Sequence, residues 1–142
     1  MHEDHGPGEA AAAWQVAANR TLKPQAAHYI RIAQAWKNAN NVDRMGQAAL
    51  SATELEPSNP DAHMLLAQAY DAASNSEWAI RHAQKSWELN PENTEVVVFL
   101  GELYEARGER RVARDLYREA LRRHPSDARI YAAFERVGGG KR

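Results

Sequence analysis

The 142-residue sequence contains no cysteine, only eight glycines and almost no net charge. The absence of cysteine excludes a disulfide framework, thiol chemistry and a thiolate metal site. A net charge of −1, from 18 basic and 19 acidic side chains, gives no overall field that would attract a nucleic acid or an anionic membrane. No apolar run approaches the roughly 18 residues that a membrane-spanning helix requires. Several classes of partner are therefore disfavoured before any motif is considered.

The N-terminal segment also lacks the features of a secretory signal. Met1 to His5 are acidic where a signal peptide is basic, and no long apolar segment follows them. An export signal would have to lie outside this sequence. We therefore favour a cytoplasmic location, with the compartment otherwise unassigned.

What the sequence does contain is alanine in abundance and a 34-residue period. β-branched runs are few apart from Val96-Val97-Val98, so the composition favours helix. The period is clearest in Pro57, Pro91 and Pro125. Further residues recur in the same register: Tyr29, His63 and Val97; Ile32-Ala33, Leu66-Ala67 and Leu100-Gly101; Trp36, Tyr70 and Tyr104; Met45, Ala79 and Ala113; Ala49, Ala83 and Tyr117; Ala52, Ser86 and Ala120. Self-similarity at this length predicts a solenoid of stacked units.

The spacing of these residues resembles the tetratricopeptide signature of a large residue, Leu-Gly, Tyr, Ala, an aromatic residue and Pro. The resemblance covers three units, 26–59, 60–93 and 94–127. The leading Trp of the pattern is replaced in every unit, and only the third unit keeps both Gly101 and Tyr117. The resemblance implies an all-α fold, an α-solenoid of three helix-turn-helix repeats with flanking capping helices.

The residues support the same architecture without the family name. Within each half-unit the apolar positions recur at three- and four-residue steps, as on one face of an α-helix. Asn59-Pro60 is typical of a helix start, Asn93 and Ser126 are further candidate caps, and Gly108 suits a left-handed helix end. We expect helices near 25–38, 43–55, 60–73, 77–89, 94–107, 110–123 and 127–137.

The repeats are expected to lie within one domain, residues 9–137, that is closed at both ends. Residues 9–20 have helical propensity and an apolar stripe around Trp14. Residues 127–137 look like the first helix of a fourth unit, which would act as a C-terminal cap because Gly138-Gly139-Gly140 follows. Residues 1–8 and 138–142 are expected to be disordered tails, and the abrupt ends suggest a fragment of a larger protein.

The sequence offers no arrangement of residues that would support catalysis or hold a cofactor. None of the six histidines forms a His-Glu-x-x-His motif or pairs with another His four residues away, so no helix-face zinc site is predicted. His63 occupies the register of Tyr29 and Val97, which favours a packed ring. The serines lie at caps or on helix faces without a matching base, so we expect neither enzymatic activity nor a cofactor or metal.

A cluster of arginines in the third unit raises the question of nucleic-acid binding. It comprises Arg107, Arg110, Arg111, Arg114, Arg118, Arg122 and Arg123. Glu109, Asp115 and Glu119 are interleaved with it, and no aromatic residue alternates with the arginines on the exposed side. We therefore favour a solvated, salt-bridged helix face over an RNA- or lipid-binding patch.

In the tetratricopeptide family the first helix of each unit lines a concave groove that binds extended or helical peptides. The resemblance places three rows of residues in that groove: Ile30, Met64 and Val98; Gln34, Gln68 and Glu102; Lys37, Asp71 and Glu105. The alternative for the apolar row is packing against neighbouring helices. Family members that clamp a peptide carboxylate use Lys, Asn and Arg at such positions, and Ile30, Gln34, Val98 and Glu102 do not supply that clamp.

The function implied is a protein-protein interaction scaffold whose ligand is a peptide or helix of a partner protein, apolar with some positive charge. The alternative is a structural module that self-assembles end to end. Trp14 at one end, and Ile130 with Phe134 at the other, are the residues that would support such stacking.

Overall fold

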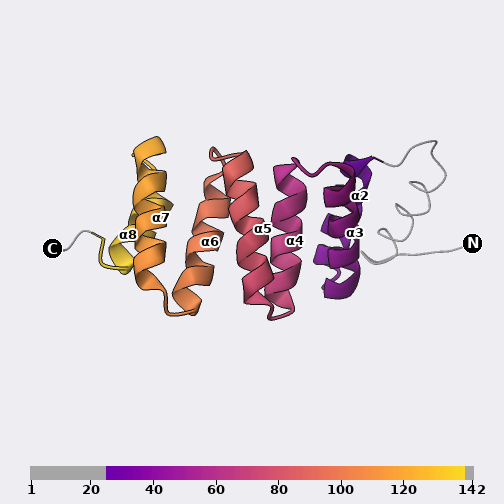
Figure 1. Cartoon of the computed structure of the whole chain (residues 1–142), viewed down its shortest axis with the longest axis horizontal. Helices are drawn as coiled ribbons and strands as arrows, with labels where there is room; N and C mark the ends of the chain where they lie inside the picture. Colours follow the sequence, from indigo (N-terminus) through magenta and orange to yellow (C-terminus); the bar gives the residue numbers. More distant parts are fainter. Residues whose placement is uncertain (1–24, 140–142) are drawn as a thin grey trace, which may run out of the picture.

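The computed structural model describes residues 25–139, which form a row of helices (Figure 1). Within this range every element is α-helical and no strand occurs. The helices are α2 (Ala26–Asn38), α3 (Val42–Leu55), α4 (Pro60–Ala72), α5 (Ser76–Leu89), α6 (Thr94–Ala106), α7 (Arg110–Arg123) and α8 (Ala128–Arg136). Each boundary lies within one residue of the expected helices, so the all-α solenoid is confirmed for this part of the chain.

Asparagine side chains fix most of the helix starts. The side-chain oxygen of Asn59 accepts from the backbone N–H groups of Asp61 and Ala62, and Asn41, Asn75 and Asn93 cap α3, α5 and α6 similarly. Such bonds satisfy backbone donors that have no partner inside the helix. At α8 the cap is Asp127, which accepts from Ile130 N at 3.0 Å, and not Ser126 as the sequence suggested.

The turns inside the hairpins depend on single residues with positive φ. Gly108 has φ of 81°, as expected for a left-handed residue after α6, and Asn40 and Ser74 take the same role with φ of 59° and 65°. Asn tolerates this conformation better than most residues, whereas Ser74 is an unusual choice. Each turn reverses the chain in about three residues and so makes consecutive helices antiparallel.

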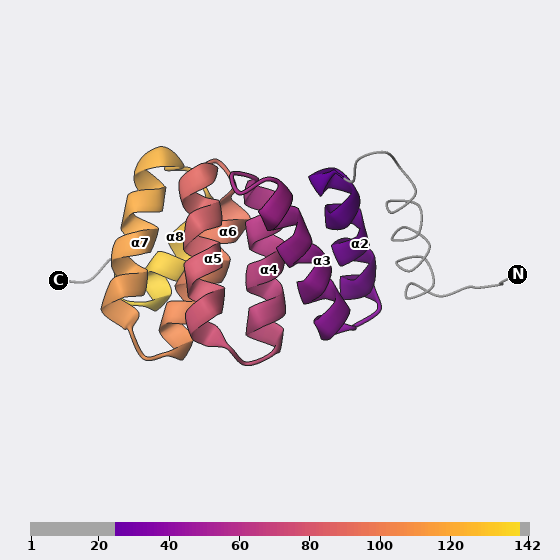
Figure 2. The ribbon, with the colours of Figure 1, turned by 45° about the vertical axis from the view of Figure 1, so that its right-hand side comes forward.

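The helices pair into three hairpins that stack in chain order. α2 packs on α3, α4 on α5 and α6 on α7, and each second helix also contacts the first helix of the next unit. α2 further lies beside α4, and α6 lies beside α8. In Figure 2, α6 and α8 are seen behind α5 and α7, which shows the two layers of first and second helices. We call α2, α4 and α6 the first helices and α3, α5 and α7 the outer helices.

Small residues allow the two helices of a hairpin to approach closely. Ala33, Ala67 and Gly101 are all buried, at equivalent positions of the three first helices. The ring of Tyr117, itself fully buried, lies against Gly101 where any side chain would clash. This contact explains a pairing in the third unit. That unit alone has an aromatic residue where the others have Ala49 and Ala83, and it alone has glycine where the others have Ala33 and Ala67.

Histidines contact the backbone of the inter-unit turns. His63 Nε2 lies 2.8 Å from Pro57 O, and His124 Nε2 lies 2.9 Å from Pro91 O. Ser86 Oγ donates to Pro60 O at 2.9 Å. The two histidine bonds satisfy carbonyls of the inter-unit turns, and His63 is a packed ring, as its register predicted.

α8 packs against α7 and α6 through Ile130, Ala133 and Val137, all of which are buried. Gly138 and Gly139 continue as a turn whose N–H groups bond to Glu135 O and Phe134 O. The expected helix 9–20, the tail 1–8 and residues 140–142 lie outside the described residues.

Candidate functional site

The apolar row predicted for the groove, Ile30, Met64 and Val98, is largely used for packing. Val98 is only 8 % exposed and belongs to the cluster around Trp87 and Ile130, against which Met64 also packs. Ile30 is half-buried against the cores of the first unit. These three side chains therefore help to hold adjacent helices together; Val98 is buried, and Ile30 and Met64 are half-buried.

The polar rows are more accessible. Gln34, Glu102, Lys37 and Asp71 are exposed, and Gln68 is half-buried. Lys37 Nζ donates to Gln68 Oε1 at 3.1 Å and so bridges α2 and α4. This bond brings two of the predicted rows together at the C-terminal halves of α2 and α4.

A hollow of about 240 Å³ opens beside this bridge. Its wall includes the predicted residues Lys37, Gln68 and Asp71 together with the half-buried ring of Phe99 from α6. The remaining lining residues are Asn40, Asn41, Val42, Met45 and Ala72. We call this feature the Phe99 hollow; it combines an aromatic surface with one cation and one carboxylate from three successive first helices.

Nothing in the sequence marks Phe99 as a groove residue. It follows the run Val96-Val97-Val98, in which every residue is apolar, so hydrophobicity alone does not show which side chain faces outward. Its register equivalents are Arg31 and Leu65, which share no chemistry with it. Only the helix position, one residue after the packed Val98, distinguishes it.

The third unit differs, because Glu105 is held by neighbouring residues. Tyr117 Oη donates to Glu105 Oε2 at 2.6 Å, and Arg136 Nη2 and Nε reach its two oxygens at 2.7 and 3.0 Å. The hydrogen bond from Arg136 is the main reason why the pKa of Glu105 is lowered; burial opposes the shift and Tyr117 adds to it. Glu105 thus joins α6, α7 and α8.

The exposed charges of this face are mostly acidic. Asp71 and Glu102 carry negative charge on α4 and α6, and Lys37 carries the positive charge on α2. Asp71 and Glu102 are exposed to solvent, whereas Glu105 is paired with Arg136. A ligand that crosses the face therefore meets an aromatic surface next to negative charge.

The histidines form no metal site within residues 25–139, where no group of three metal-ligating side chains occurs. His63 and His82 instead form a pair, with their Nδ1 atoms 3.0 Å apart and their rings stacked. Because Pro57 O can only accept, His63 carries its proton on Nε2 and His82 donates through Nδ1. Burial and the nearby His63 lower the pKa of His82. The pair serves packing between α4 and α5.

The terminal residues proposed for end-to-end stacking are partly occupied. Ile130 is fully buried in the core beneath α8, and Phe134 is half-buried against the same cluster. The exposed aromatic residue of α8 is Tyr131, at 55 %. Trp14 lies outside the described residues. No helix among the described residues is long and apolar enough to cross a bilayer.

Comparison with known proteins agrees with this architecture. Residues 72–136 match the family model described as Tetratricopeptide repeat. None of the curated proteins compared with the sequence is similar enough to count as a match.

Solved structures share the fold at low sequence identity. The crystal structure of MamA matches with a TM-score of 0.82 at 16 % identity, over 99 % of this chain and 86 % of that one. The first TPR of Spaghetti (RPAP3), bound to the HSP90 peptide SRMEEVD, matches with a TM-score of 0.70 at 16 % identity, over 80 % and 92 %. TTC0263, a thermophilic TPR protein in Thermus thermophilus, matches with a TM-score of 0.73 at 16 % identity, over 92 % and 70 %. Residues 72–136 thus match the tetratricopeptide repeat model, and the solved structures show that the chain shares the fold of tetratricopeptide proteins.

Proposed function

We propose that this chain is a protein-interaction scaffold that binds a short segment of a partner protein in the groove lined by α2, α4 and α6. The observation that carries the proposal is the Phe99 hollow, where Lys37, Gln68 and Asp71 surround an aromatic ring. Three successive first helices contribute to it, so a ligand seated there would contact every repeat. Catalysis forms no part of this proposal.

The size and lining of the hollow favour one apolar side chain as its occupant. Its volume of about 240 Å³ is below the range of roughly 300–1,000 Å³ that is usual for small-molecule sites. An aromatic wall with a few polar groups at the rim is the usual composition of a pocket that anchors a single side chain of a peptide. A leucine, methionine or aromatic residue of the ligand would fit this description.

The charge of the face favours a basic ligand. Asp71 and Glu102 are exposed carboxylates on the helices that border the hollow. The peptide in the Spaghetti structure, SRMEEVD, is acidic toward its C-terminal end. Like charges would repel such a peptide here, whereas lysine or arginine beside the apolar anchor would be attracted. We therefore propose an apolar, basic segment as the ligand.

Selection from a random heptapeptide library on the immobilised chain tests this proposal. We expect the enriched peptides to combine an apolar residue with lysine or arginine. The variant Asp71→Lys/Glu102→Lys reverses both exposed carboxylates and should bind those peptides at least about tenfold more weakly, because attraction becomes repulsion. Glu77→Lys/Glu88→Lys is the matched control, since it makes the same change of charge at two exposed positions of the outer helix α5.

The outcome is decisive in either direction. Absence of enrichment above background would contradict the proposal, as would enrichment of acidic sequences. Equal loss of binding in the groove variant and in the control would assign the effect to net charge and not to the groove. Val98 is unsuitable for this test, because a charge placed in its buried position would impair folding.

A further inference from the structure

Charge is strongly segregated along the described solenoid, although the whole chain is nearly neutral. Residues 25–106 carry five basic and eleven acidic side chains, a net charge of −6. Residues 107–136 carry nine basic and five acidic side chains, a net charge of +4. The first two units are thus acidic, and the C-terminal end is basic. Such asymmetry creates a field that orients a complementary surface.

The 34-residue register places this contrast on the outer helices. One position holds Asp43, Glu77 and Arg111 in the three units, and another holds Glu54, Glu88 and Arg122. In each helix the two positions are 11 residues apart, which is about three turns and about 16 Å. α3 and α7 therefore present charges of opposite sign at the same spacing.

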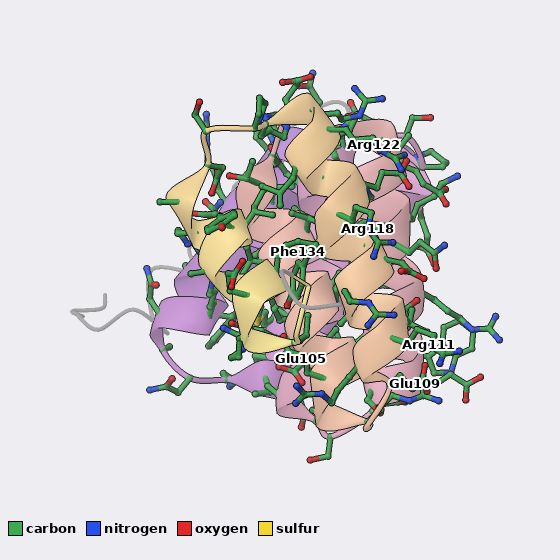
Figure 3. All side chains as sticks on the ribbon, turned by 90° about the vertical axis from the view of Figure 1, so that its left-hand side faces the viewer. Glu105, Glu109, Arg111, Arg118, Arg122 and Phe134 are labelled. Atoms are coloured by element: carbon green, nitrogen blue, oxygen red, sulfur yellow. The ribbon has the colours of Figure 1, made fainter. Side chains whose placement is uncertain are left out.

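The basic side forms a stripe along α7. Figure 3 shows Arg111, Arg118 and Arg122 on one side of this helix, at the C-terminal end of the molecule. All three are exposed, and Arg118 pairs with Asp115 at 2.9 Å. Val112, next to Arg111, is 43 % exposed, so an apolar side chain accompanies the stripe.

The acidic side adjoins an apolar hollow. This second hollow, of about 240 Å³, lies between α3 and α4 and is lined by Gly46, Leu50, Leu66, Ala69 and Tyr70, with Asp43 among its remaining residues. Leu50 is 44 % exposed. Asp43 and Glu54 are exposed, and neither takes part in a salt bridge observed among the described residues.

We infer that α7 of one copy docks on α3 of a second copy of this chain. In a parallel pairing of the two helices, Arg111 lies opposite Asp43 and Arg122 opposite Glu54, while Val112 reaches the hollow beside Leu50. The matched 11-residue spacing is what points to the chain itself as the partner. The hollow used in this contact shares only Val42 with the Phe99 hollow, so the inference is distinct from the proposed groove.

The carboxylates interleaved with the arginines of α7 favour a second copy over a nucleic acid. Asp115 and Glu119 lie on the exposed part of α7 among the arginines, and they would repel a continuous phosphate backbone. Helix α3 of a second copy carries its carboxylates at separate positions, Asp43 and Glu54, and so avoids that repulsion.

The two docking surfaces lie on different units, so each contact leaves one surface free on each copy. Such heterologous contacts extend into open chains unless the geometry closes a ring.

Light scattering of the full chain over a concentration series tests the inference. At about 0.01 M ionic strength, where the screening length is about 30 Å, we expect the mean mass to rise beyond that of a dimer. At about 1 M, where the screening length is about 3 Å, the chain should be monomeric. Arg111→Glu/Arg122→Glu should weaken association about tenfold or more, and Asp43→Arg/Glu54→Arg should do the same.

Combining the four substitutions reverses both surfaces and should restore association, because the charges are complementary again. Lys85→Glu/Arg129→Glu, at exposed positions away from the stripe, is the matched control and should associate like the unmodified chain. Helical circular dichroism verifies that each variant folds. A chain that stays monomeric at low salt, or association that ignores salt or charge reversal, would overturn the inference. So would a monomeric chain that uses Arg111 to bind an oligonucleotide or a Glu-rich peptide instead.

Discussion

The phenol of Tyr117 donates a 2.6 Å hydrogen bond to Glu105, and this bond ties the second helix of the third unit to its first helix. Arg136 of α8 approaches the same carboxylate. Three helices therefore meet at one acidic side chain. The position predicted to touch a ligand is instead used to fasten the C-terminal cap.

Tyr117→Phe removes the hydroxyl and keeps the buried ring. We expect the free energy of unfolding to fall by about 1–2 kcal/mol, because a hydrogen bond to a charged group is lost in a partly buried site. Urea denaturation measures the change. Tyr131→Phe is the control, since the Tyr131 hydroxyl also bonds to a carboxylate, that of Glu135, but at a site on α8 that is open to water; a comparable loss there would contradict the assignment.

Glu105 should also contribute to acid sensitivity. Its pKa in the folded chain is lowered below the usual value of 4.5, chiefly by the hydrogen bond from Arg136. As the pH falls, Glu105 therefore takes up a proton in the unfolded chain before it does so in the folded chain. The stability that Glu105 provides is complete above pH about 4.5 and is lost as the pH falls through the lowered pKa. Glu105→Gln should flatten the fall of stability below pH 4.5, as measured by denaturation at a series of pH values. An unchanged slope would show that Arg136 stabilises the folded state in some other way.

Gly101→Ala and Gly46→Ala should change stability in opposite directions. A Cβ at Gly101 collides with the ring of Tyr117, so this variant should lose about 1–3 kcal/mol through overpacking. A Cβ at Gly46 meets Ala69 at 3.6 Å, an ordinary contact, and alanine in mid-helix should add about 0.5–1 kcal/mol. Melting temperatures of the two variants check both signs. A stabilised Gly101→Ala variant would be incompatible with the packing of Tyr117 described above.

The His63–His82 pair predicts a second pH dependence. Burial, followed by the charge of His63, lowers the pKa of His82 below 6.5. Its ring is also stacked near Tyr70 and Trp78, with centroids 5.7 and 6.2 Å away. A lowered pKa means that the unfolded chain binds more protons, so stability is complete above pH 6.5 and falls as the pH drops from 6.5 through the lowered value.

His82→Gln should remove most of the dependence between about pH 7 and pH 5 and leave the dependence below about pH 4.5 in place. Glu105→Gln should show the converse pattern, so the two variants control each other. Denaturation midpoints across both windows provide the measurement. If His82→Gln keeps the full pH dependence of stability between about pH 7 and pH 5, another group takes up the proton.

The sequence predicted the helices and their stacking accurately because those features follow from local chemistry. Asn59-Pro60 marks a helix start by capping and fixed φ, and Gly108 marks a helix end by its left-handed backbone. The 34-residue period then assigns equivalent positions in the units. None of this depends on contacts between residues far apart in the chain.

The candidate site was harder to predict because it depends on such contacts. Val98 is buried through Trp87 and Ile130, which belong to the neighbouring helices α5 and α8. Glu105 is held by Arg136, 31 residues away. Phe99 becomes part of a site only because α2 and α4 bring Lys37 and Gln68 beside it. A repeat register shows which positions correspond, but neighbouring side chains decide which of them face solvent.

The central claim is that the first helices form the docking face of this scaffold. The most direct measurement is a two-dimensional NMR titration of the ¹⁵N-labelled chain with the tightest peptide from the library selection. We expect the amide signals of Gln68, Asp71 and Phe99 to shift most, with α5 and α7 largely unaffected. Shifts concentrated on α5 or α7, with those three signals unmoved, would contradict the account.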